Sequence, residues 1–141
     1  MAEEISSLPT PVPIAFLLCD QISVDQTTKK KTIVGIFDRM WVGRFPTNYR
    51  PASLFARMID CEGEYAVRVE YVQVSTQAVL GQAEGVARSS SRHAYTDVVL
   101  SWPVIPIPEP GEYEFRLWMN NKFINSIRFT ARPRTEMEVQ S

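Results

Sequence analysis

The segment Glu112-Tyr-Glu-Phe-Arg-Leu-Trp-Met119, joined through Asn120-Asn121-Lys122 to Phe123-Ile-Asn-Ser-Ile-Arg-Phe129, decides the fold class. Apolar and polar side chains alternate along both halves, as they do in the half-buried strands of an antiparallel hairpin. No stretch of the chain repeats apolar residues with a helical period. The segment therefore predicts two antiparallel strands that turn one face toward a core.

The length of the connecting loop decides which side chains of this hairpin enter the core, because a one-residue slip turns every side chain to the other face. A two-residue turn at Asn120-Asn121 would set Phe115 opposite Ser126. A three-residue loop, residues 120–122, sets Phe115 opposite Ile127 and keeps apolar side chains together. We therefore predict the three-residue loop, which asparagine suits because it tolerates the left-handed conformation.

The same register predicts an unusual outer face for the hairpin. It pairs Glu114 with Arg128, as expected on a wet surface, but it also sets Trp118 beside Ile124. Contiguous apolar side chains on a surface that otherwise carries charge are typical of a protein interface. We predict that Trp118, Ile124 and the neighbouring Arg116 contact a protein partner or a second copy of the chain.

The rest of the chain adds strand-like runs separated by turn residues. These runs cover residues 14–24, 32–37, 52–60, 65–75, 79–87 and 98–102. Prolines at 103, 106, 108 and 110 then interrupt any ladder, which favours an edge or a crossover. We predict an all-β domain, an antiparallel two-sheet β-sandwich of about eight strands, immunoglobulin-like or C2-like in general architecture. A small closed barrel is less favoured, since it has no edges for prolines to protect.

Length and composition agree with one ordinary domain. The chain has 141 residues and a formal net charge of −1, so neither nucleic acid nor an anionic membrane is an expected partner. We expect a folded domain at 13–131 between flexible segments at 1–12 and 132–141. The first apolar run is too short to cross a bilayer, and acids stand where a secretory signal carries bases. We therefore expect a cytoplasmic location in a prokaryote, with Cys19 and Cys61 as buried free thiols.

Two parts of the sequence resemble a known family. The first comprises Leu18-Cys-Asp20, Ile22, Asp25, Thr28-Lys29 and Ile33-Val-Gly-Ile-Phe-Asp38, and the second is Pro110-Gly-Glu-Tyr-Glu-Phe115. Together they resemble a bacterial family of unknown function, made up of small stand-alone β-sandwich proteins, over most of residues 13–131. The resemblance implies a fold. It implies no activity and carries no functional residues over to this chain.

No catalytic constellation emerges from the sequence. His93, the only histidine, lies near the serines at 89–91 and near Asp97. A catalytic triad, however, is assembled from separate scaffolded positions, and one polar loop rarely supplies it together with an oxyanion hole. Neither a nucleophile elbow nor a glycine-rich phosphate loop is present. We expect a protein that is not an enzyme and that holds no cofactor.

A metal site has weak support. One histidine and two distant cysteines match no zinc spacing. Asp60, Glu62 and Glu64 place three carboxylates around a glycine at a strand connection, and carboxylate oxygens are the ligands that calcium prefers. The spacing is not that of a complete calcium loop, and acidic turn residues are usually just solvated. These three residues are therefore weak calcium candidates.

A second candidate surface lies in the irregular segment 41–50, which gathers Trp41, Arg44, Phe45, Tyr49 and Arg50. Aromatic rings beside arginines can stack on a sugar, a base or a peptide. The plainer interpretation is a loop whose aromatic side chains cap one end of the core.

Taken together, these patterns favour a non-enzymatic interaction or assembly module that binds another protein or itself. The alternative is a ligand-binding β-sandwich, which would hold carbohydrate through segment 41–50 or calcium through the acidic connection.

Overall fold

The computed structural model describes residues 8–49 and 51–136, and every element of more than one turn within them is a strand. The strands are β1 (Val12–Val24), β2 (Lys31–Ile36), β3 (Arg39–Val42), β4 (Thr47–Tyr49), β5 (Ala52–Ile59), β6 (Gly63–Gln73), β7 (Ala78–Ser89), β8 (Thr96–Trp102), β9 (Ile105–Ile107), β10 (Gly111–Met119) and β11 (Lys122–Pro133). Residues 134–136 add a single helical turn. The prediction of a nearly all-β chain is confirmed.

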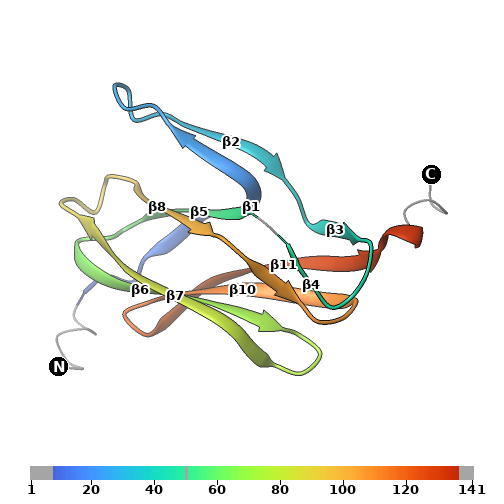
Figure 1. Cartoon of the computed structure of the whole chain (residues 1–141). Coiled ribbons are helices and arrows are strands. Elements are labelled where there is room, and N and C mark those ends of the chain that lie inside the picture. Colours follow the sequence, from blue (N-terminus) through green and yellow to red (C-terminus); the bar gives the residue numbers. More distant parts are fainter. Residues whose placement is uncertain (1–7, 50, 137–141) are drawn as a thin grey trace.

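The strands form three open sheets, two of them large. One has four strands in the order β2-β1-β5-β8, the second has five in the order β3-β11-β10-β6-β7, and β4 pairs with β9 in a small third sheet. Figure 1 shows the two large sheets as layers that face each other. The short strands β4 and β9 lie in the segments predicted to be irregular or proline-interrupted, and β3 overlaps the start of the first. They pair through three or four residues each, too few to leave a period in the sequence.

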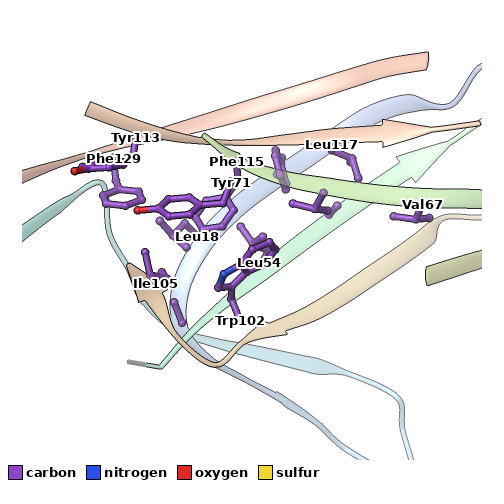
Figure 2. Close-up of a cluster of buried hydrophobic side chains, with 14 of the residues drawn as sticks. Leu18, Leu54, Val67, Tyr71, Trp102, Ile105, Tyr113, Phe115, Leu117 and Phe129 are labelled. Atoms are coloured by element: carbon purple, nitrogen blue, oxygen red, sulfur yellow. The ribbon is translucent and has the colours of Figure 1, made fainter. Parts of the chain in front are cut away.

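The core lies between the two large sheets and is rich in aromatic rings (Figure 2). Tyr71 stacks on Phe115 at a centroid distance of 4.9 Å, and Trp102 meets Phe115 edge-on at 5.1 Å. The buried hydroxyl of Tyr71 donates a hydrogen bond to the Pro106 carbonyl at 2.8 Å, so its burial leaves no donor unsatisfied. Gly81 lets β7 approach this cluster, because a Cβ there would stand 3.2 Å from the Trp102 ring.

The last hairpin confirms the predicted core register and corrects the predicted loop. Phe115 lies opposite Ile127 and Glu114 opposite Arg128, as expected. The turn, however, has two residues: Asn120 and Asn121 both adopt positive φ, 49° and 61°, as a tight hairpin turn of the type I′ class requires. The register recovers through a bulge in β11, where Ile124 has no partner of its own opposite the step from Leu117 to Trp118. The three-residue loop was therefore wrong, and the bulge supplies the extra residue.

The hairpin of β1 and β2, residues 19–36, extends beyond the two layers (Figure 1). Val12 to Cys19 of β1 pairs with β5, whereas Gln21 to Val24 pairs with β2 alone among the described strands. Its turn is closed by Asp25, whose Oδ1 accepts the backbone N–H groups of Thr27 and Thr28 at 2.9 and 2.8 Å. A salt bridge of 2.7 Å from Lys31 to Asp97 ties the hairpin to β8.

The ends of the described chain contact the body of the molecule. Leu8 packs against the core, and the Tyr65 hydroxyl donates to the Pro9 carbonyl at 2.8 Å. The predicted flexibility of residues 1–7 and 137–141 lies outside the described residues. No helix in the described part of the chain is long and apolar enough to cross a membrane.

Candidate functional site

The Trp118 indole is held by its own chain, on the outer face of the five-stranded sheet. Its Nε1–H donates to Glu70 Oε1 at 2.9 Å, and the Arg68 guanidinium lies 4.9 Å from its ring centroid. Phe123 meets it edge-on at 5.5 Å. The tryptophan is therefore half-buried by three neighbours from β6 and β11.

The predicted pairing of Trp118 with Ile124 is wrong, and the bulge is the reason. Trp118 pairs with Phe123, and Ile124 packs partly against the core. The exposed apolar side chain beside the indole is that of Phe123, which is 52% exposed. Sequence reasoning missed Phe123 because the three-residue loop had placed it opposite Met119.

The third predicted interface residue, Arg116, belongs to a charge network on the same face. Glu114 accepts hydrogen bonds from both Arg116 and Arg128, the latter at 2.9 Å. Burial raises the pKa of Glu114, but the two guanidinium groups outweigh it and hold this pKa below its ordinary value. Arg116 also donates to Gln77 at 2.8 Å. This network gives the face a fixed polar surface.

The predicted ligand-binding residues separate into two groups. Trp41 and Tyr49 line a surface hollow of about 280 Å³ with Asn48 and Arg134, and Arg39 lies 5.7 Å from the Trp41 ring centroid. Phe45 and Tyr49 pack against the core, as a capping loop would, while Arg44 is exposed. Arg50 lies outside the described residues.

The acidic connection after β5 does not gather its carboxylates. Asp60 faces Arg92 at 3.7 Å, and Glu64 forms an ion pair with Arg88 at 2.7 Å. Glu62 is exposed, and its backbone N–H donates to the Tyr65 hydroxyl. Within residues 8–49 and 51–136, no group of three acidic, histidine or cysteine side chains is placed to hold a metal ion.

His93 and Asp97 take up different surroundings. The His93 side chain is exposed, and its backbone N–H donates to Ser91 Oγ at 3.2 Å. Asp97 accepts two hydrogen bonds from Arg57, at 2.8 and 3.0 Å, and the salt bridge from Lys31. Hydrogen bonding from Arg57 lowers the pKa of Asp97, and the contribution of Lys31 adds to it against the opposing effect of burial. Asp97 thus anchors the β1–β2 hairpin.

A surface that the sequence analysis overlooked lies on this β1–β2 hairpin. Val34 and Ile36 of β2 are 46% and 61% exposed, and the outer edge of β2 pairs with no strand among the described residues. Ile33 and Lys31, which alternate with them, are half-buried and turn to the other face. The signal was present in the apolar run of residues 33–37, but such a run also fits a strand covered on both sides.

Comparison with known proteins shows the family of this chain. The model of a family of unknown function, DUF6941, matches residues 14–132, and the chain belongs to that family. No curated protein matches the sequence. A crystal structure of a β-glucosidase from Listeria innocua in complex with isofagomine aligns with 83% of this chain at 10% identity and a TM-score of 0.41. The chain spans 16% of the length of that enzyme.

Proposed function

We propose that this member of the family is a non-enzymatic interaction module, a β-sandwich of two main sheets that binds protein through its β1–β2 hairpin. One observation carries the proposal: β2, whose outer edge pairs with no described strand and whose apolar side chains are exposed, extends away from the body of the molecule (Figure 1). Such edges are usually shortened, covered or charged, because they pair readily with other chains. Strand addition is a common mode of protein recognition.

The hairpin is a better candidate than the Trp118 face for a physical reason. Trp118 already packs on Arg68 and Phe123 and hydrogen-bonds Glu70 within its own chain. Val34 and Ile36, in contrast, remain open to solvent on a strand whose backbone still has one free edge among the described residues. An interface there would satisfy backbone groups and bury apolar side chains together.

The proposal is tested by photo-crosslinking in cells. A photoreactive amino acid replaces Ile36 in the full chain, and the matched control carries it at Val86, which is 56% exposed on the outer face of the five-stranded sheet. We expect crosslinks to a protein, either another polypeptide or a second copy, from position 36 and few from position 86. Equal crosslinking at both positions, or none at 36, contradicts the assignment.

The Trp41 hollow supports a second candidate function, carbohydrate binding. Two aromatic side chains, Trp41 and Tyr49, line the hollow together with the amide of Asn48 and the guanidinium of Arg134, a combination that can stack on a sugar ring and bind its hydroxyl groups. Titration with neutral oligosaccharides, followed by tryptophan fluorescence, tests it. We expect saturable binding that Trp41→Ala abolishes, and a flat titration rejects this function.

A further inference from the structure

We propose that the partner of the β1–β2 hairpin is a second copy of this chain, with β2 paired antiparallel to β2 about a two-fold axis through Val34. The inference rests on the proposed function and names its partner. It joins the two four-stranded sheets into one continuous sheet across the axis. Three features of the described residues carry it: a free edge, an apolar face and a self-complementary pattern of charge.

The free edge is accessible. β2 is the end strand of its sheet, and no described strand pairs with its outer side. The hairpin extends past the two layers, which keeps its tip away from the rest of the described strands (Figure 1). Six residues, Lys31–Ile36, give it the length of an ordinary strand.

The apolar face gives the pairing an energetic reason. Val34 and Ile36 are both exposed in the single chain, whereas Lys31 and Ile33 are half-buried and Lys31 reaches Asp97. With Val34 on the axis, the two Val34 side chains lie side by side and each Ile36 lies opposite Thr32 of the other copy. Four apolar side chains then form one continuous stripe.

The charges select this orientation and register. Lys29 and Lys30 precede the strand, Lys31 begins it, and Asp38 lies two residues after its end. A parallel pairing would set lysines beside lysines. An antiparallel pairing about Val34 sets Lys30 opposite Asp38 of the other copy, twice by symmetry, and both residues are exposed. Moving the axis to Gly35 removes this charge pair. The lysines thus disfavour other pairings and favour this one.

The two-fold arrangement also closes the assembly. If β2 paired with a different free edge, such as β7 or β8 of another copy, a pair of copies would still have one free β2 and one free partner edge, so the contact would build a filament or a larger ring. Pairing β2 with itself uses the same edge of both copies and ends at a dimer.

The register is tested by disulfide formation in the purified full chain under mild oxidation. Only a residue on the axis meets its own copy, so we expect Val34→Cys to form a covalent dimer. Thr32→Cys and Ile36→Cys are matched controls from the same face: each alone stays monomeric, because its copies lie roughly 13 Å apart, whereas a mixture of the two forms a heterodimer. The wild-type chain controls for Cys19 and Cys61, which are buried. Self-crosslinking of Thr32→Cys with none of Val34→Cys overturns the register.

Sedimentation of the uncrosslinked chain tests the charges and the dimer itself. We expect Lys30→Glu and Asp38→Lys each to raise the dimer dissociation constant at least tenfold, and the double variant to restore it. Val86→Lys should leave it unchanged. A wild-type chain that stays monomeric up to about 100 µM overturns the dimer. If position 36 still crosslinks to another protein in cells, the self-pairing fails while the proposed function stands. Assembly into species larger than a dimer would indicate that β2 pairs with a different strand edge, and it would also overturn the proposed β2–β2 dimer.

Discussion

The Glu114 carboxylate lies on the outer face of the five-stranded sheet, where neighbouring side chains cover it almost completely. Its side chain is only 7% exposed. Its two hydrogen bonds to arginines keep its pKa below the ordinary value of 4.5. We expect Glu114→Gln to lower the free energy of unfolding at pH 7 by about 1 to 3 kcal/mol, as loss of a hydrogen bond to a charged group does. Denaturant unfolding at neutral pH measures it.

The same carboxylate predicts a pH dependence. Its folded-state pKa is lowered, so the folded state binds fewer protons than the unfolded chain near pH 4. The stabilisation is complete above about pH 4.5 and declines as the pH falls through the folded-state pKa. Unfolding curves of the wild type and Glu114→Gln should therefore converge in acid. Glu112→Gln is the control, because Glu112 is exposed and shares Arg128. If the difference in free energy of unfolding between the two proteins stays the same at all pH values, this explanation is wrong.

Trp118 stabilises the monomer through contacts that all lie within one chain. Trp118→Ala removes the cation–π contact with Arg68 and the hydrogen bond to Glu70, and we expect it to lower the free energy of unfolding by about 1 to 2 kcal/mol. Phe115→Ala, in the core, should cost about 3 to 5 kcal/mol. Sedimentation should show no change in association for Trp118→Ala. A tenfold loss of association would place the interface on this face after all.

At the scale of elements, the turn between β10 and β11 depends on Asn120. Its φ is positive, and its Oδ1 accepts the Ala66 backbone N–H of β6 at 2.8 Å. Asn120→Ala both strains the backbone and leaves that donor without its partner, so we expect a loss of about 2 kcal/mol. Asn121→Gly is the matched control: glycine suits positive φ, which offsets the lost hydrogen bond to Arg68, and the change should stay within about 0.5 kcal/mol. Chemical denaturation of both variants measures these two changes in the free energy of unfolding.

This turn also shows what sequence could and could not predict. Alternation of side chains determined the core register of β10 and β11, since only one pairing keeps Phe115 opposite Ile127. A three-residue loop and a two-residue turn with a bulge give that same pairing. In the structure the two-residue turn also contacts β6, where Asn120 accepts a hydrogen bond from Ala66, 54 positions away in sequence. The local sequence pattern of the hairpin gives no information about a contact with so distant a residue.

The candidate surfaces were harder to predict than the strands. Trp41 and Tyr49 do come together, because both lie on short strands at one end of the molecule. The exposed edge of β2 was not predicted, because an apolar run such as residues 33–37 normally indicates a buried strand. Only the order of the strands in the sheet shows that no described strand covers this edge. Exposure of an edge is a property of the whole assembly of strands.

At the scale of the whole molecule, the β1–β2 hairpin and the core should open separately. Regions with few core contacts unfold locally, below the free energy of global unfolding. Cys19 lies at the base of the hairpin opposite Ile36, whereas Cys61 belongs to the core cluster. Burial raises the pKa of both thiols, so both react slowly in the folded state. The two cysteines therefore report on the two parts of one molecule.

We expect a thiol reagent at pH 8 to label Cys19 faster than Cys61. Local opening of the hairpin exposes Cys19, whereas Cys61 becomes accessible only when the core unfolds. Cys19→Ser and Cys61→Ser assign the two phases. If β2 pairs with β2 of a second copy, higher protein concentration should slow labelling of both cysteines, because dimerisation stabilises the closed hairpin by mass action and global unfolding of the core must also break the dimer. Equal rates at both sites, matching global unfolding, would show instead that the hairpin and the core form one cooperative unit.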